Sequence, residues 1–292
     1  MHRRDVIGVL MSAVTWPALL KPRAQPNPPA PIDFAALEQS VAGRLGVAVL
    51  DVESSRRLSY RAGERFPMCS TFKWLLAAQV LSRIDAGEEQ LSRAVPYGPA
   101  EVLEYAPVTR AHVAEGSMRV GELAAAAVQA SDNTAGNLLL RANGGPDSFT
   151  AFLRRIGDQV SRLDRTEPEL NSADPGDVRD TTTPRAMLDD MRRVLLGDTL
   201  GAASRRQLLD WLAGSTTGAN RLRAGLPSGW RAGDKTGTGA HGATGDLAII
   251  WPPARGPVLV AAYIADSSAT LQVREAAFAA IGRSIPAWLA GR

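Results

Sequence analysis

The sequence predicts an α+β protein: an antiparallel five-stranded sheet flanked by helices, with an all-helical domain inserted between its strands. Two strand-like runs and a helix lie near the start of the chain, and three strand-like runs and a helix close it. The residues between them show helical periodicity. Strands from both ends must therefore meet in one sheet. With 292 residues, 45% of them hydrophobic, the chain can bury a sizeable core.

Each element of the sheet domain has a local signal. Asp33 is a good N-cap for a helix over residues 34–44. A turn at residues 53–55 separates the first two strand-like runs, and a Gly-rich turn at residues 239–245 makes a hairpin of two later ones. The expected strands are residues 46–50, 58–60, 230–238, 246–251 and 258–265, and the closing helix is residues 270–289.

The spacing of apolar residues is helical over residues 70–210. Gly87 ends the first of these helices. Thr183 is an N-cap followed by Pro at the first helical position, and Ser204 is expected to cap a later helix. Clefts between two such halves are where functional sites usually lie. The expected sheet domain is residues 25–66 and 214–292, and the expected helical domain is residues 67–213.

Residues 1–24 are typical of an export signal. Arg3 and Arg4 precede a moderately apolar stretch, residues 6–20, and Pro-rich sequence follows Ala24. The paired arginines resemble a twin-arginine signal, and a general secretory signal with a basic start is the alternative. Either signal predicts a periplasmic protein. No apolar run reaches the ~18 residues that a membrane span needs.

The charge balance argues against a nucleic-acid partner. The net charge is +3, and residues 1–24 account for it, which leaves 29 basic and 29 acidic residues in the rest. A body without net charge attracts phosphate weakly. The single cysteine, Cys69, excludes an internal disulfide, and the three histidines are too few for a His-rich metal cluster. We therefore expect neither a metal nor another cofactor.

Lysine is rare enough in this chain to be informative. Of the 33 basic residues, 30 are Arg, and only Lys21, Lys73 and Lys235 are Lys. Lysine can lose its proton where arginine cannot, so Lys73 and Lys235 are candidates for proton transfer. Ser70 and Lys73 lie at i and i+3 at the start of a helix, which places both on one face. A neutral Lys73 can then take the Ser70 proton, whereas an N-cap serine beside a surface lysine is the structural alternative.

Two further motifs combine hydroxyl, amide and amine groups. Residues 131–133 (Ser-Asp-Asn) lie where a helix ends, and a turn of the Asx type is the structural alternative. Residues 235–238 (Lys-Thr-Gly-Thr) lie in a strand. There Gly237 lets a ligand lie along the backbone and Lys235 supplies positive charge, whereas an edge strand containing a glycine is the alternative.

The stretch 162–180 shows neither helical nor strand periodicity. Loops of this length inside a compact domain are uncommon and usually functional. Arg165 and Asp180 lie near its two ends and can form an ion pair that clamps it. The loop carries Glu167 and Asn171 in the sequence Glu-Pro-Glu-Leu-Asn, for which a solvated acidic loop is the alternative.

The four motifs occur in a fixed order, S-x-x-K, S-D-N, E-x-x-L-N and K-T-G, starting at Ser70, Ser131, Glu167 and Lys235. With this order and spacing, the chain resembles the class A β-lactamases, an active-site-serine family. The resemblance covers nearly all of the chain after the export signal, and longer matching runs are residues 104–109, 131–135 and 162–165. It implies a hydrolase of β-lactam antibiotics that confers resistance and uses no metal or cofactor.

The resemblance also implies catalytic roles. Ser70 is the nucleophile that forms an acyl-enzyme, and its base in acylation is either neutral Lys73 or Glu167 acting through a water. Glu167 and Asn171 hold and activate the water that deacylates the enzyme. Ser131 relays a proton to the departing ring nitrogen.

The same resemblance implies how a β-lactam is held. Lys235 influences the charge on the Ser131 side of the site, and the backbone N–H groups of Ser70 and Thr238 form the oxyanion hole. Tyr105 forms an aromatic wall, and Arg221 takes the place of an arginine that residues 245–247 lack. The expected substrate-binding residues are Tyr105, Asn133, Arg221, Lys235, Thr236 and Thr238. We expect a monomer.

Two other classes of function remain open at this point. A penicillin-binding D,D-peptidase or a drug sensor shares the fold but stalls after acylation, because it lacks the water pair of Glu167 and Asn171. A non-enzymatic Arg-rich binding protein is the second class, and the neutral charge of the body argues against it. Some carbapenem-hydrolysing relatives bond Cys69 to a cysteine where this chain has Gly239, which lowers the expectation of carbapenem hydrolysis.

Overall fold

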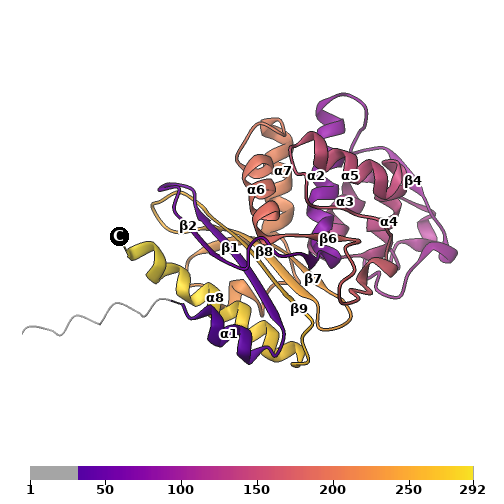
Figure 1. The fold of residues 1–292 in the computed structure, drawn as a ribbon. Coiled ribbons are helices and arrows are strands. Elements are labelled where there is room, and N and C mark those ends of the chain that lie inside the picture. Colours follow the sequence, from indigo (N-terminus) through magenta and orange to yellow (C-terminus); the bar gives the residue numbers. More distant parts are fainter. Residues whose placement is uncertain (1–31, 292) are drawn as a thin grey trace, which may run out of the picture.

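The structure is a computed structural model that describes residues 32–291 (Figure 1). Its main sheet has five antiparallel strands contributed by both ends of the chain, which confirms the predicted α+β fold. The expected export signal, residues 1–24, lies outside the described residues. In sheet order the strands are β2 (Arg57–Tyr60), β1 (Arg44–Asp51), β9 (Val258–Ala265), β8 (Thr244–Trp251) and β7 (Arg231–Thr238).

Both faces of this sheet are buried. On one face, Val258, Val260 and Ile264 of β9 join a core with α1 (Phe34–Ser40) and α8 (Leu271–Ala290). On the other face, alternate residues of the same strand, among them Tyr263, pack against the helical half of the molecule. Side chains of a strand alternate between its two faces, so a strand covered on both sides is apolar throughout. This explains the continuous apolar run of β9.

Six helices form the other half of the molecule, with α2 at their centre (Figure 1). Every residue from 72 to 81 of α2 is buried, Lys73 among them. A polar side chain in so enclosed a helix needs partners around it. The helices are α2 (Phe72–Asp85), α3 (Val120–Gln129), α4 (Asn133–Ala142), α5 (Gly145–Arg155), α6 (Pro184–Leu195) and α7 (Ala202–Ala213).

This half is not purely helical. Strand β3 (Phe66–Pro67) pairs with β6 (Thr181–Thr182), and β4 (Ala94–Pro96) pairs with β5 (Ser117–Arg119). Strands of two or three residues are too short to show an alternating pattern in a sequence. The β3–β6 ribbon joins the end of the 162–180 loop to the segment that leads into Ser70.

The helix starts show where local sequence was sufficient. Asp33 and Thr183 cap their helices as predicted, each accepting from the backbone N–H three residues later. The prediction that Ser204 is an N-cap is wrong, because α7 begins two residues earlier and Ser204 Oγ donates to Asp85 at 2.6 Å. Asp85, from the end of α2, also accepts from Gly201 N at 2.8 Å. A carboxylate from another helix thus caps α7.

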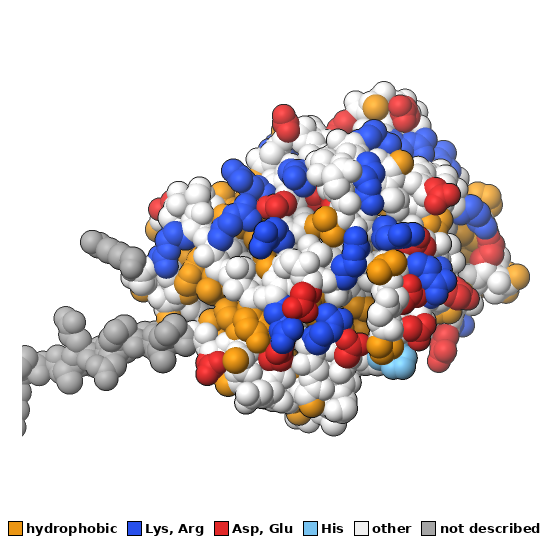
Figure 2. Space-filling model, viewed as in Figure 1, with side chains coloured by type: hydrophobic (Ala, Val, Ile, Leu, Met, Phe, Trp, Pro, Cys, Tyr) orange, Lys and Arg blue, Asp and Glu red, His pale blue; other side chains and the backbone are white. Residues whose placement is uncertain are grey.

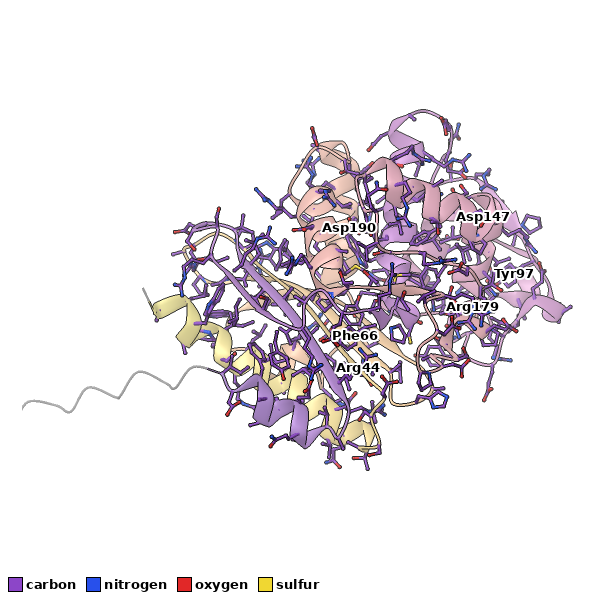
Figure 3. The ribbon with its side chains drawn as sticks, in the orientation of Figure 1. Arg44, Phe66, Tyr97, Asp147, Arg179 and Asp190 are labelled. Carbon is purple, nitrogen blue, oxygen red and sulfur yellow. The ribbon has the colours of Figure 1, made fainter. Side chains whose placement is uncertain are left out.

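Two carboxyl groups share a buried site beside the start of the 162–180 loop. Asp158 accepts from the N–H groups of Val160 and Ser161, and Asp190 of α6 accepts from Arg193 (Figure 3). The other oxygen of each carboxyl group, Asp158 Oδ2 and Asp190 Oδ2, is buried and has no hydrogen-bond partner. Burial, and then the charge of Asp158, raise the pKa of Asp190 well above its usual value, so Asp190 is the one of the two that keeps a proton.

The folded wild-type protein should lose stability as pH rises, because Asp190 gives up its proton. We expect Asp190→Asn to remove this loss. The stabilising contribution of protonated Asp190 is complete below the ordinary aspartate pKa of 3.8 and is lost as pH rises through the higher pKa of the folded state. An asparagine at this position is uncharged at every pH and has no proton to lose. The stability of the variant relative to wild type, from urea unfolding, increases as pH rises above 3.8.

Asp189→Asn is the matched control, because Asp189 is the adjacent residue and its partly exposed carboxylate pairs with Arg57 at 3.0 Å. It should leave the pH dependence of unfolding near that of wild type. A constant difference between Asp190→Asn and wild type at every pH would show that Asp190 does not keep a proton above its ordinary pKa.

Candidate active site

The turn before α2 sets the position of Ser70. Ser70 lies in a short 3₁₀ turn, Cys69–Thr71, that runs directly into α2, and Lys73 is the second residue of that helix. Cys69 adopts a left-handed conformation with φ of 44° and is buried. Lys73 Nζ lies 3.0 Å from Ser70 Oγ. The two side chains therefore share one face, as the spacing predicts.

The Lys73 side chain is fully buried, and its amine nitrogen has only oxygen atoms as polar neighbours. Its Nζ donates to Ser131 O at 2.8 Å and to Asn133 Oδ1 at 2.6 Å, and it lies 2.9 Å from Glu167 Oε1. Burial lowers the pKa of Lys73, and the charge of Glu167 acts in the opposite direction. The neutral amine is therefore more accessible here than in water.

The second lysine reaches the same place from the sheet. Lys235 of β7 is fully buried, and its Nζ donates to Ser131 Oγ at 2.9 Å and to Thr236 O at 2.8 Å. Burial, and then the charge of Lys73, hold the pKa of Lys235 well below its usual value. One lysine thus contacts the carbonyl of Ser131 and the other contacts its hydroxyl.

Residues 131–133 connect α3 to α4. Asp132 is fully buried and caps α4 by accepting from Ala135 N at 2.8 Å. It also accepts from the N–H groups of Val108 and Thr109. The structural alternative for this motif was an Asx-type turn at the end of a helix, and the structure has instead an N-cap of the next helix. Asp132 fixes the connection, while its two neighbours Ser131 and Asn133 contact the lysines.

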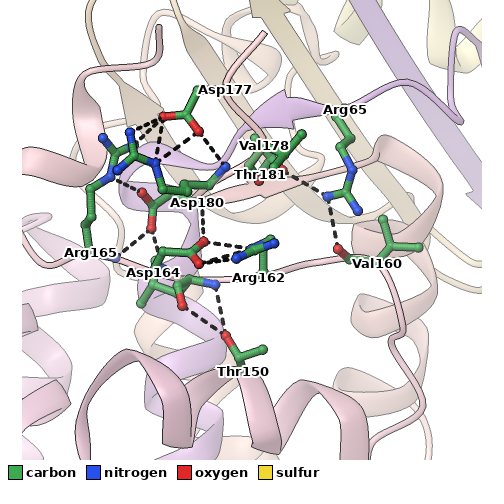
Figure 4. A network of polar contacts seen from close by, with 12 residues as sticks. Arg65, Thr150, Val160, Arg162, Asp164, Arg165, Asp177, Val178, Asp180 and Thr181 are labelled. Carbon is green, nitrogen blue, oxygen red and sulfur yellow. Dashed lines mark hydrogen bonds and ion pairs between the residues drawn. The ribbon is translucent and has the colours of Figure 1, made fainter.

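An ion pair closes the 162–180 loop, as predicted (Figure 4). Arg165 Nε lies 2.6 Å from Asp180 Oδ2, and Asp180 Oδ1 accepts from the N–H groups of Asp164 and Arg165. The loop contains one short 3₁₀ turn, Glu169–Asn171. The loop therefore has a fixed shape with little regular secondary structure.

The clamped loop places Glu167 against Ser70. Glu167 Oε1 lies 3.2 Å from Ser70 Oγ, and Asn171 Nδ2 donates to the other carboxylate oxygen. Asn137 of α4 holds the backbone of Glu167 in both directions, accepting from its N–H at 2.9 Å and donating to its carbonyl at 2.8 Å. Asn137 was not predicted as a site residue, although its spacing of four residues from Asn133 places it on the same helical face.

Strand β7 is the edge strand beside Ser70. A Cβ on Gly237 would lie 2.8 Å from Met68 O and 3.1 Å from Thr71 N, so only glycine allows this approach. The group that lies against Gly237 is therefore the protein's own backbone, whereas the sequence predicted a ligand there. Thr236 Oγ1 lies 2.6 Å from the hydroxyl of Thr217, a residue that was not predicted.

Arg221 lies at the start of the short 3₁₀ helix η5 (Leu222–Gly225) and is buried. Its Nη1 donates to Gly237 O at 2.8 Å and to Gly245 O at 2.7 Å, and its Nη2 donates to Thr238 Oγ1 at 2.7 Å. Arg221 is therefore held against the sheet and is not an exposed surface arginine. Arg221 joins β7 to β8 at the edge of the site.

These residues surround a cavity of about 370 Å³. Lys73, Glu167 and Lys235 lie beneath it, and Tyr105, 52% exposed, forms part of its rim. Every site residue that the sequence predicts lies in the cavity wall or directly behind it. The lining residues are Ser70, Tyr105, Ser131, Asn133, Asn171, Thr217, Arg221, Thr236, Gly237 and Thr238.

Other features of the described chain bear on function. Within residues 32–291, no three His, Cys, Asp or Glu side chains gather closely enough to ligate a metal. No helix in the same range has the length and apolar character to cross a bilayer. Figure 2 shows acidic and basic side chains distributed together over one face of the molecule.

Two Ser-Lys contacts face each other in this site: Ser70 with Lys73 at the start of α2, and Ser131 with Lys235 of the edge strand β7. This arrangement defines an active-site-serine enzyme of the β-lactamase and D,D-peptidase type. The family model described as "Beta-lactamase enzyme family" matches residues 32–289. The chain belongs to this family, and the relatives below place it among the class A β-lactamases, as its motifs predict.

The relatives cover most of the chain. The chain is 49% identical to Beta-lactamase CTX-M-25 of Escherichia coli over 86% of either chain, and 45% identical to Carbapenem-hydrolyzing beta-lactamase KPC of Klebsiella oxytoca over 94% of either chain. An ancestral class A β-lactamase (GNCA) superposes with a TM-score of 0.85 at 58% identity, covering 87% of this chain and 97% of that one.

We expect Arg165→Ala to destabilise the folded protein by about 3 kcal/mol, because it leaves the buried Asp180 carboxylate without its cation. The variant should also become sensitive to proteolysis within the 162–180 loop. Urea unfolding and limited proteolysis measure the two effects.

Arg179→Ala is the control from the same loop, because Arg179 pairs with Asp177 at the surface with 52% of its side chain exposed. Surface pairs contribute little, so this variant should unfold close to wild type. Equal losses in the two variants would show that the clamp by Arg165 has no special role.

Proposed function

We propose that the chain hydrolyses the β-lactam amide of penicillins and cephalosporins through a Ser70 acyl-enzyme, and so confers antibiotic resistance. One observation carries this proposal: Ser70 Oγ has Lys73 Nζ at 3.0 Å and Glu167 Oε1 at 3.2 Å at the floor of one cavity. A hydroxyl with two proton acceptors beside it can be activated to form an ester and can be released from it.

Acylation begins when Ser70 Oγ attacks the carbonyl carbon of the strained ring. Its proton passes to neutral Lys73 or to Glu167, and both groups lie within hydrogen-bond distance. The carbonyl oxygen becomes an oxyanion that the N–H groups of Ser70 and Thr238 stabilise, a contribution of about 10²-fold or more for each donor. The close approach at Gly237 supports this pairing, because it brings β7 against the Ser70 turn.

The ring opens when its carbon–nitrogen bond breaks and the nitrogen takes a proton from Ser131. Ser131 Oγ accepts from Lys235, so the hydroxyl hydrogen of Ser131 is directed elsewhere and can be donated. The hydrogen bond from Lys235 Nζ stabilises the Ser131 oxygen as it gives up this proton. The proton that left Ser70 then restores the Ser131 hydroxyl and leaves Glu167 free to act as a base, so Ser131 is the relay to the leaving group.

Deacylation uses Glu167. Once acylated, Ser70 Oγ is an ester oxygen and has no hydrogen to donate to Glu167, so this carboxylate can accept from a water instead. Asn171 orients the carboxylate through its second oxygen. The water adds to the ester carbonyl and gives its proton to Glu167, and Ser70 Oγ takes up that proton as its bond to the acyl carbon breaks. Such base catalysis contributes ~10²–10⁴-fold.

The polar walls fit the rest of a β-lactam. Asn133 Oδ1 accepts from Lys73, which leaves Nδ2 to donate to the substrate's side-chain amide. Lys235, Thr236 and Thr238 bind the substrate carboxylate. Arg221 only donates, so Thr238 Oγ1 must accept from it, and the hydroxyl hydrogen of Thr238 remains for the carboxylate. The exposed ring of Tyr105 covers the bound drug.

One chain supplies every residue that the proposed mechanism uses, and we propose a monomer as the active form. Residues 1–24 are proposed as an export signal of the twin-arginine type that directs the protein to the periplasm. We also propose two domains for the chain. The sheet domain is residues 25–66 and 214–292, and the helical domain is residues 67–213.

We expect Glu167→Ala to acylate and then stall, because the ester lacks a base for the attacking water. Mass spectrometry after incubation with a penicillin should show a lasting adduct on Ser70, and kcat should fall about 10²–10⁴-fold. Glu169→Ala is the control from the same loop, because Glu169 is exposed, and it should turn over normally. Wild-type turnover by Glu167→Ala would overturn the deacylation role, and a lasting adduct on the unchanged protein would favour a D,D-peptidase or drug sensor.

We expect the double change Arg3→Lys and Arg4→Lys to keep the enzyme inside the cytoplasm. A twin-arginine signal depends on the arginine pair, whereas a general secretory signal needs only positive charge. Cell fractionation with β-lactamase activity as the readout measures the result. Arg23→Lys, the same change outside the pair, should be exported normally. Normal export of the double variant would identify the general secretory route.

A further inference from the structure

The segment that carries Arg221 rests on α8. A Cβ on Gly225 would lie 1.9 Å from Ala279 O, and a Cβ on Gly282 would lie 2.2 Å from Leu222 O. Glycine on both sides thus lets η5 lie directly on the helix, with the side chain of Leu222 fully buried. This contact sets the distance between η5 and α8. The direction of Arg221 toward β7 and β8 needs a further restraint.

Asp246 of β8 supplies a restraint from the sheet side. It is fully buried, and its Oδ2 accepts from Leu222 N at 3.0 Å. The preceding residue, Gly245, accepts from Arg221 Nη1 at 2.7 Å through its carbonyl. Two successive residues of β8 therefore bind two successive residues of the Arg221 segment, one through a side chain and one through the backbone.

Neither a helix nor a strand fixes the backbone of Arg221. Its φ and ψ are −103° and −132°, outside the helical region, so the contacts on each side of it determine its orientation. The mechanism proposed above gives Asp246 no role. Burial, and then the charge of Asp234, raise the pKa of Asp246 well above its usual value, whereas Arg221, the N–H of Leu222 and Arg223 act in the opposite direction.

We propose that Asp246 is a positioning residue for substrate recognition, which holds the Arg221 segment so that the guanidinium stays on Thr238 at the carboxylate end of the cavity. This inference rests on the proposed function. Without the acceptor on Asp246, the N–H of Leu222 has no partner, and the segment shifts to find one. Arg221 then leaves Thr238 Oγ1, and the hydroxyl of Thr238 is no longer oriented toward the substrate carboxylate.

A pair of substrates that differ only at the carboxylate measures this effect. The ratio of kcat/KM for a penicillin to kcat/KM for its methyl ester reports recognition of the carboxylate. Arg221→Ala should lower the ratio by about tenfold or more, the usual effect of a lost hydrogen bond to a charged group. Asp246→Val should lower it in the same direction, mainly through KM for the free acid. Asp246→Asn should retain it, because the amide oxygen still accepts from Leu222 N.

Asp51→Val is the matched control. Asp51 is an equally buried aspartate and the last residue of β1, where it pairs with Val258 of β9. Its carboxylate accepts from Ser54 and Arg255. Its loss should change stability and leave the ratio unchanged. Asp246→Ala replaces the valine variant if that protein does not fold, because it removes the same acceptor with a smaller side chain.

A double variant tests whether Asp246 acts through Arg221. Adding Asp246→Val to Arg221→Ala should lower the ratio no further, because the guanidinium is already absent. If Asp246→Val loses activity equally on the penicillin and on its methyl ester, Asp246 has a structural role only, and the proposal fails. The proposal also fails if Asp246→Asn matches Asp246→Val. If Arg221→Ala keeps the ratio, the proposed carboxylate role of Arg221 fails, and the role of Asp246 fails with it.

Discussion

The contact between Lys73 and Glu167 is the interaction on which the rest of the site depends. The two charged groups lie 2.9 Å apart, and neither side chain is exposed. Charges buried this completely are tolerated only when every partner is in place. Here the partners come from the start of α2, the connection into α4 and the 162–180 loop. The capping of α4 by Asp132, the hold of Asn137 on the Glu167 backbone and the Arg165–Asp180 clamp are therefore requirements of one buried pair.

The cavity lies where the helical half meets the edge of the sheet, and each half contributes a different part of the chemistry. The helical half supplies the nucleophile and its bases, whereas β7 supplies Lys235 and the hydroxyls proposed for the carboxylate. The two halves meet closely because Gly237 has no side chain. A shift of β7 away from Ser70 would separate the proposed oxyanion donors from the nucleophile while leaving each half intact. The edge position of β7 in the sheet thus serves the active site.

The sequence predicts those parts of the molecule whose signals are local. The strands, the caps at Asp33 and Thr183, and the motifs that begin at Ser70 and Lys235 all follow from short-range patterns. Ser204 shows the limit, because the group that caps α7 is Asp85, from another helix. Asn137, Thr217 and Asp246 were missed for the same reason: a polar residue usually marks the solvent side, and only tertiary contacts reveal that these three face inward.

Carboxylates perform four different tasks within this fold, and their surroundings decide which task each one has. Asp132 accepts several backbone N–H groups and is a structural cap, whereas Asp180 faces a guanidinium and is a clamp. Asp190 faces another acid and keeps its proton. Glu167 alone among them touches the Ser70 hydroxyl, its second oxygen is held by the Asn171 amide, and its cation partner is Lys73, whose pKa is lowered by burial. A carboxylate becomes a base when its partners orient it and leave its charge available, which is the arrangement around Glu167.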